Sequence, residues 1–210
     1  MTRYLTSISI ATDDERIFAA ARGFGAEARM TRSDHFSGTD RVAEVASSSP
    51  AEIIVNIQGD EPLIDPGAID AAVLPMLDEP DVVMSTLRKR IEDPREIDDP
   101  NVVKVVTDRR GDAIYFSRST IPYVRERQSS PAAVFYKHIG LYVYRRDFLL
   151  GYSDLPVGPL EQAERLEQLR ALENGFSIRV MDTEYESVGV DTPEDLERVS
   201  RLFESTMTRG

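Results

Sequence analysis

The chain has 210 residues and a formal net charge of −12, which argues against non-specific electrostatic binding to nucleic acid or to an anionic membrane surface. It has no cysteine and only two histidines, so disulfides and thiolate metal sites are excluded and a zinc centre is disfavoured. Carboxylates are plentiful, so chemistry based on a hard cation such as Mg²⁺ stays open.

The length suits one good-sized domain, and we expect residues 1–210 to form a single domain. No apolar run reaches the roughly 20 residues that a membrane-spanning helix needs. The N-terminus also lacks the apolar segment of a signal peptide. A cytoplasmic protein without a membrane partner is therefore expected.

The first part of the chain alternates between strands and helices. Strands are predicted at residues 7–11, 26–30 and 53–58, and helices at 14–24, 40–47 and 66–77. This alternation favours an α/β fold with a mostly parallel, helix-covered sheet.

The second part mixes more strands with helices. We predict strands at residues 82–87 and 138–144, a hairpin of 101–107 with 113–117 that turns at Gly111, short strands at 178–181 and 187–190, and helices at 146–152, 159–174 and 192–207. Residues 120–133 contain prolines and many small or charged residues, and we expect a mobile loop there.

The stretch from Ile53 to Pro62 carries the strongest signal for a site. An apolar, β-branched run stops at Gly59, and Asp60 follows at once. In open α/β sheets, ligands bind at the carboxyl ends of the strands, which makes Asp60 a candidate metal or phosphate ligand. The alternative is that Asp60 only solvates a turn.

Asp191 follows a second short apolar run, Val188 to Val190. Two carboxylates at one sheet edge can share a Mg²⁺ that bridges nucleotide phosphates. The same stretch also begins a helix, with Thr192 as its cap and Pro193 in its first turn. Capping accounts for Thr192 onward but does not require Asp191.

Other local signals are weaker. Ser37, Gly38 and Thr39 offer hydroxyls and amides to a base edge or phosphate, but they are equally an ordinary loop that ends in a helix cap. The chain has no Walker lysine motif and no Gly-x-Gly-x-x-Gly fingerprint, which disfavours P-loop and dinucleotide-binding functions. A lone histidine such as His138 is more often structural than catalytic.

Taken together, the motifs resemble the 3-deoxy-manno-octulosonate (Kdo) cytidylyltransferases, also called CMP-Kdo synthetases. The matching stretches are Ala-Thr-Asp-Asp at 11–14, Thr-Arg-Ser-Asp-His-Phe-Ser-Gly-Thr-Asp-Arg at 31–41, Val-Asn-Ile-Gln-Gly-Asp-Glu-Pro at 55–62, Asn-Val-Val-Lys-Val-Val at 101–106, Tyr-Phe-Ser-Arg-Ser-Thr-Ile-Pro at 115–122, His-Ile-Gly-Leu-Tyr at 138–142, Pro-Leu-Glu at 159–161 with Leu-Glu-Gln-Leu-Arg at 166–170, and Gly-Val-Asp-Thr-Pro-Glu-Asp-Leu at 189–196. Each motif alone is weak, but the ordered set covers nearly the whole chain and is specific.

The resemblance implies a Rossmann-like nucleotidyltransferase sheet with helices on both faces and a small β-rich region for sugar binding and dimerisation. It implies transfer of CMP from CTP to Kdo for lipopolysaccharide biosynthesis, with Mg²⁺ as cofactor and a homodimer as the assembly. By this similarity Asp60 and Asp191 are the catalytic, metal-binding carboxylates. Arg32, Ser37, Gly38, Thr39 and Gln58 match the nucleotide side, and Arg118, Arg125, His138, Tyr142, Glu167 and Gln168 match the sugar side.

The chain departs from the family's pattern at its start. Family members begin with a strand and a basic nucleotide loop ahead of the stretch that corresponds to residues 7–11. We therefore expect an N-terminally truncated form that is poorly active. The alternatives are a cytidylyltransferase for another acidic sugar, such as a sialic acid or an amino-substituted Kdo, and an inactive binding module.

Overall fold

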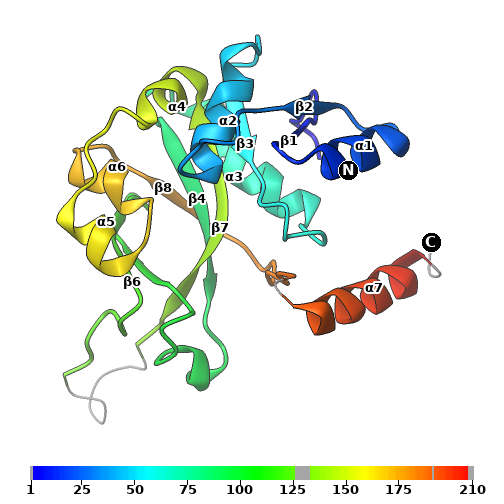
Figure 1. Ribbon diagram of the computed structural model, residues 1–210. Helices are drawn as coiled ribbons and strands as arrows, with labels where there is room; N and C mark the ends of the chain where they lie inside the picture. Colours follow the sequence, from blue (N-terminus) through cyan, green and yellow to red (C-terminus); the bar gives the residue numbers. More distant parts are fainter. Residues whose placement is uncertain (1, 126–132, 191, 208–210) are drawn as a thin grey trace.

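The computed structural model describes residues 2–125, 133–190 and 192–207, and it is built around a six-stranded sheet (Figure 1). Its strands follow the order β6-β5-β7-β4-β8, and β3 also pairs with β7. They are β3 (Ile53–Asn56), β4 (Met84–Arg90), β5 (Lys104–Thr107), β6 (Ala113–Ser117), β7 (Tyr136–Arg145) and β8 (Arg179–Asp182).

The long strand β7 determines the character of this sheet. β3, β4 and β5 all pair with β7 in antiparallel fashion, and β8 is parallel to β4. Thus β3, β4, β5 and β8 run in one direction, while β7 and β6 run in the other. The α/β class is as predicted. The expectation of mostly parallel strand pairing is wrong, because β7 lies between strands that run in the opposite direction and pairs with them in antiparallel fashion.

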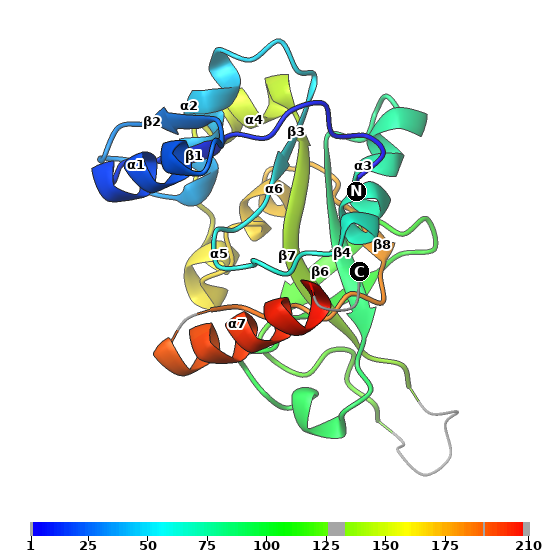
Figure 2. The same cartoon turned by 90° about the vertical axis from the view of Figure 1, so that its right-hand side faces the viewer.

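Helices cover both faces of the sheet, as Figure 2 shows from the side. On one face, α3 (Pro66–Asp78) packs Ala72, Val73 and Met76 against Leu141 and Val143 of β7. On the other face lie α2 (Gly38–Ser47), α4 (Arg146–Tyr152) and α6 (Leu169–Glu173), whose apolar side chains surround Tyr144. Successive residues of a strand point to opposite faces, so β7 contributes to both cores.

The remaining elements lie around this sheet. β1 (Ile10–Thr12) and β2 (Ala28–Met30) form a separate two-stranded parallel sheet beside α1 (Glu15–Gly23), and η1 (Pro94–Glu96) is a short 3₁₀ turn. α7 (Pro193–Met207) begins with the predicted Thr192 cap, whose Oγ1 accepts from the backbone N–H of Asp195 at 3.1 Å. None of the helices in the described ranges is long and apolar enough to cross a membrane.

The predicted single helix over residues 159–174 is wrong. α5 (Pro159–Glu164) ends at Arg165, which has a left-handed backbone with φ 55°, and α6 begins only at Leu169. The Glu164 carboxylate accepts hydrogen bonds from Ser117 and from the backbone N–H of Arg118, so tertiary contacts determine where the helix stops. Glu161 accepts two hydrogen bonds from the guanidinium of Arg170 across the break.

Several other boundaries differ from the sequence prediction. Residues 187–190 are extended but do not form a strand, and β1, β2 and β3 are shorter than predicted. The hairpin of β5 and β6 is present and turns at Gly111, whose φ of 88° suits glycine. Of the predicted mobile loop, residues 126–132 lie outside the described part of the chain.

Candidate active site

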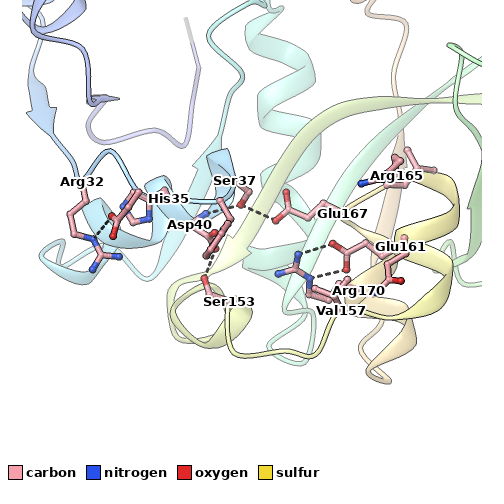
Figure 3. Close-up of a pocket in the computed structure, with 14 residues that line it drawn as sticks. Arg32, His35, Ser37, Asp40, Ser153, Val157, Glu161, Arg165, Glu167 and Arg170 are labelled. Atoms are coloured by element: carbon pink, nitrogen blue, oxygen red, sulfur yellow. Dashed lines mark hydrogen bonds and ion pairs between the residues drawn. The ribbon is translucent and has the colours of Figure 1, made fainter.

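A cavity of about 670 Å³ opens between the loop before α2 and the turn between α5 and α6 (Figure 3). One wall holds Arg32, His35, Ser37 and Asp40, and the other holds Glu161, Arg165, Glu167 and Arg170. The lining combines charged groups of both signs with apolar side chains of Phe36, Val157 and Leu166, and its polar groups suit a ligand with hydroxyl and acidic groups.

Glu167 joins the two walls. Its carboxylate accepts hydrogen bonds from the hydroxyls of Ser37 at 3.2 Å and Thr39 at 3.3 Å, and Ser37 also caps α2 by accepting from the N–H of Asp40. Burial raises the pKa of Glu167 above its ordinary value. The cap interpretation of Ser37 is therefore confirmed, and the binding-loop interpretation stays a prediction.

A histidine missed by the sequence analysis stabilises the loop before α2. His35 Nε2 pairs with the Glu44 carboxylate, which also accepts from the backbone N–H of Arg32 at 3.1 Å. Hydrogen bonding to His35 and Arg32 lowers the pKa of Glu44. His35 and Glu44 are nine residues apart and belong to different elements, so no local sequence pattern points to the pair.

The predicted sugar residues His138 and Tyr142 lie side by side on β7. Their rings are 5.4 Å apart, and the His138 ring also meets Phe116 edge-on at 5.0 Å. His138 Nε2 is 2.9 Å from the hydroxyl of Thr86. Burial lowers the pKa of His138 to about 3, so the imidazole is neutral near pH 7 and acts as a hydrogen-bonding group rather than a cation.

Three other predicted sugar residues differ in their surroundings. Arg118 is held by backbone carbonyls, because its guanidinium donates to Glu164 O at 2.8 Å and to Pro100 O at 3.0 Å. Gln168 is only 5 % exposed, whereas Arg125 is exposed. The structure thus brings Glu167 together with Ser37 and Thr39, but it does not place Arg118 or Arg125 on the lining of the cavity.

The predicted metal ligand Asp60 lies at the turn after β3. Its side chain is exposed and forms no hydrogen bond or ion pair within the described ranges, so its oxygens are available to a cation. Its backbone oxygen accepts from the N–H of Val190 at 3.0 Å. Asp191, the other predicted ligand, lies outside the described residues, and among the rest of the chain no cluster of three or more acidic or histidine side chains is placed to hold a metal.

Gln58 connects this turn with the loop before α2. A Cβ on Gly38 would lie 3.9 Å from Gln58 Oε1, so the β3 turn passes close to the first residue of α2. Asp60 and Gln58 are nevertheless not on the lining of the large cavity. Of the described nucleotide and metal candidates, Arg32 and Ser37 therefore line the cavity, whereas Gln58 and Asp60 lie at the end of β3.

Comparison with known proteins identifies the family. A family profile described as "Cytidylyltransferase" matches residues 2–182, and the 3-deoxy-manno-octulosonate cytidylyltransferase of Solibacter usitatus is 72% identical over the whole chain and 82% of its own length. The chain belongs to the 3-deoxy-manno-octulosonate cytidylyltransferase family. The relative from Syntrophotalea carbinolica bears the same name and is 56% identical over 91% of this chain and 79% of its own.

Solved structures agree with this family assignment and confirm the resemblance found in the motifs. A CMP:2-keto-3-deoxy-manno-octonic acid synthetase, solved in complex with CTP, matches 98% of this cytidylyltransferase and 83% of its own chain, with a TM-score of 0.90 and 43% identity. An inositol-1-phosphate CTP transferase from T. maritima, at 15% identity and a TM-score of 0.58 over 94% of this chain and 74% of its own, shares the fold. The predicted nucleotidyltransferase fold is thus confirmed.

Proposed function

We propose that this enzyme transfers CMP from CTP to Kdo, giving CMP-Kdo and diphosphate for lipopolysaccharide biosynthesis. The observation that carries the proposal is the 72% identity over the entire chain to a Kdo cytidylyltransferase. The cavity supports it, because hydroxyl, carboxylate and guanidinium groups converge there from elements far apart in sequence.

In the proposed reaction, the anomeric hydroxyl of the sugar attacks the α-phosphorus of CTP. A new oxygen–phosphorus bond forms, the bond from that phosphorus to the bridging oxygen breaks, diphosphate leaves with the electron pair, and the hydroxyl proton passes to solvent. The protein has to hold the two substrates in line and offset their negative charge. No covalent enzyme intermediate is needed.

The residues divide between the substrates. We assign the nucleotide to Arg32, Ser37, Gly38, Thr39 and Gln58, and the sugar to Arg118, Arg125, His138, Tyr142, Glu167 and Gln168. Glu167 lies at the junction, because it accepts from the two hydroxyls on the nucleotide side. A carboxylate there can orient a sugar hydroxyl while it keeps the loop before α2 in place.

We assign Mg²⁺ to Asp60 and Asp191. The carboxylate of Asp60, which is exposed and has no partner among the described residues, fits a hard cation, and the hydrogen bond from Val190 to Asp60 O brings the residue preceding Asp191 to the same turn. When bound, Mg²⁺ supplies positive charge to the triphosphate. We also propose that the enzyme works as a homodimer in the cytoplasm, and sedimentation at several protein concentrations tests the dimer.

The test is diphosphate release from CTP and Kdo in the presence of Mg²⁺. We expect release that depends on Kdo and is much slower with a sialic acid or an amino-substituted Kdo. Faster diphosphate release with one of those sugars than with Kdo would identify that sugar as the substrate. Failure both to bind CTP in calorimetry and to release diphosphate would contradict the proposed function.

A further inference from the structure

The segment between β8 and α7, residues 183–190, passes directly along the turn that carries Asp60. It starts next to β4, where the N–H of Thr183 donates to Arg88 O at 2.9 Å, and it ends where Val190 donates to Asp60 O at 3.0 Å. The segment is extended without strand pairing, so side-chain contacts have to hold it in place. Asp191 is the next residue in the chain.

One side of this segment is held by Glu61, the neighbour of Asp60. The hydroxyl of Tyr185 donates to Glu61 Oε2 at 2.7 Å, and the hydroxyl of Ser187 donates to Glu61 Oε1. Both carboxylate oxygens of Glu61 are thus occupied by donors from residues 183–190. Burial, together with the nearby Glu61, raises the pKa of Tyr185, so the phenol stays protonated and remains a donor.

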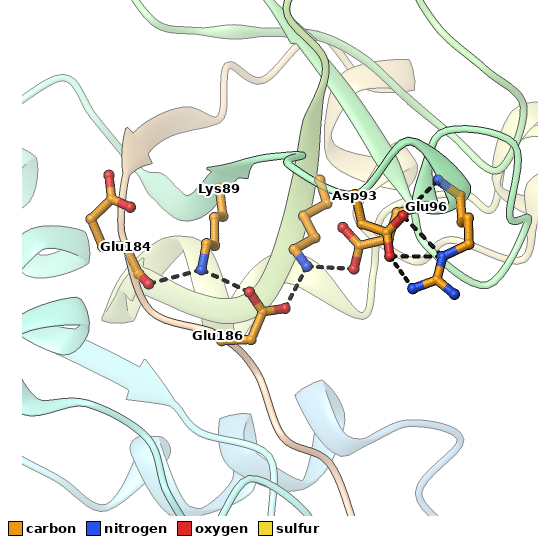
Figure 4. A network of polar contacts seen from close by, with 7 residues as sticks. Lys89, Asp93, Glu96, Glu184 and Glu186 are labelled. Carbon is orange, nitrogen blue, oxygen red and sulfur yellow. Dashed lines mark hydrogen bonds and ion pairs between the residues drawn. The ribbon is translucent and has the colours of Figure 1, made fainter.

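The other side is held by two lysines of the sheet (Figure 4). Glu186 bridges Lys89 of β4, at 2.7 Å, and Lys137 of β7, and Lys137 also binds Glu96 at 2.7 Å. Side chains 185 and 187 therefore point one way and side chain 186 the other, as in any extended chain. Among the described residues, the side-chain contacts that connect the segment to the turn of Asp60 are those of Glu61, beside the backbone hydrogen bond from Val190 to Asp60 O.

We propose that Glu61 is a positioning residue for the metal site, which holds the segment 183–190 against the turn that carries Asp60. This rests on the proposed function, because it assumes that Asp60 and Asp191 hold the metal. Glu61 acts through Tyr185 and Ser187 rather than as a ligand, since each of its oxygens already accepts a hydrogen bond.

The test compares two ways of breaking the same contacts. Glu61→Ala removes the acceptor and its charge, whereas the double variant Tyr185→Phe with Ser187→Ala removes the donors and keeps the charge. Glu184→Gln is the matched control, because its carboxylate is exposed and makes no hydrogen bond with the described residues, yet it belongs to the same segment. The single variant Tyr185→Phe keeps the ring and serves if the double variant fails to fold.

We measure Mn²⁺ binding by electron paramagnetic resonance with CTP present, and hydrogen exchange of residues 183–190 in the metal-free protein. Glu61→Ala and the double variant each lose two hydrogen bonds. In both proteins we expect the Kd for Mn²⁺ to rise about tenfold and hydrogen exchange of residues 183–190 to become about tenfold faster. Glu184→Gln should match the wild type. Raising the Mn²⁺ concentration should restore turnover in the double variant, which a general folding defect would not allow.

Three outcomes would overturn the inference. Weaker Mn²⁺ binding in Glu61→Ala but not in the double variant would mean that Glu61 acts by its charge or as a ligand. Unchanged exchange in both variants would mean that the contacts do not hold the segment. If the wild-type protein with CTP binds no Mn²⁺, the proposed metal site itself fails, and the exchange data then report only a structural contact.

Discussion

The most direct prediction concerns Lys104, which is completely buried at the start of β5. Its ammonium group donates to the backbone oxygens of Asp99 at 2.8 Å, Val102 at 2.6 Å and Arg118 at 2.7 Å. Burial lowers the pKa of Lys104. The side chain therefore ties the loop before β5 to the residue after β6, and that residue is the proposed sugar ligand Arg118.

We expect Lys104→Met to destabilise the protein, because methionine fills a similar volume but leaves the carbonyls without their donor. The three bonds lie in partly buried surroundings, so each should contribute about 1 kcal/mol, or roughly 3 kcal/mol together. For a chain of this size, 1 kcal/mol shifts the Tm by about 2 to 4 °C, and the predicted loss is about 6 to 12 °C. The KM for Kdo should rise as well, because Arg118 loses support.

Thermal unfolding followed by circular dichroism measures the shift. Lys89→Met is a suitable comparison, since among the described residues Lys89 has two hydrogen-bond partners, Glu186 and the Glu184 carbonyl, and a smaller loss is expected there. A Tm decrease below about 2 °C in Lys104→Met would show that water replaces the ammonium at little cost, and the reasoning would be refuted.

Further predictions concern the site. Asp60→Asn and Asp191→Asn should each reduce Mg²⁺-dependent diphosphate release at least about a hundredfold with little change in Tm, and wild-type rates in either would remove that residue from the metal site. Because the pKa of Glu167 is raised, the folded state holds its proton more tightly than the unfolded state does. The free energy of unfolding of the wild type should therefore fall relative to that of Glu167→Gln as the pH rises from about 4.5, and parallel curves of unfolding free energy against pH would contradict this. Because the pKa of His138 is lowered, the free energy of unfolding should instead fall as the pH drops from 6.5 towards about 3. His138→Gln should reduce the slope of unfolding free energy against pH in this range, and an unchanged slope would count against a buried neutral imidazole. If residues 1–210 form the single domain expected from the sequence, calorimetry should show one cooperative unfolding transition.

The local patterns of the sequence predicted most elements near the proposed site. The apolar run from Ile53 and the glycine at position 59 correctly placed β3 and the turn of Asp60, and the signals around Thr192 correctly placed the start of α7. These features depend on neighbouring residues, which is why periodicity and capping rules find them.

The features that the sequence missed depend on distant residues. The break at Arg165 follows from contacts of Glu164 with Ser117 and Arg118, about 47 positions away, and helical spacing alone predicted an unbroken helix. The pair of His35 and Glu44 and the contacts of Glu61 with Tyr185 likewise join separate elements. Tertiary contacts of this kind override local preferences, and no single sequence reveals them.

The position of β7 has a consequence for how the protein forms during synthesis. Within the sheet, β3 and β4 are joined through β7, because both pair with residues 136–145 and neither pairs with the other. Until translation has passed residue 145, the backbone groups of β3 and β4 that pair with β7 therefore have no native strand partner, although α3 is already available to pack on one face. Such late closure slows folding and leaves the nascent polypeptide open to aggregation, so this enzyme should depend on chaperones more than an α/β protein of equal size whose neighbouring strands follow one another in sequence.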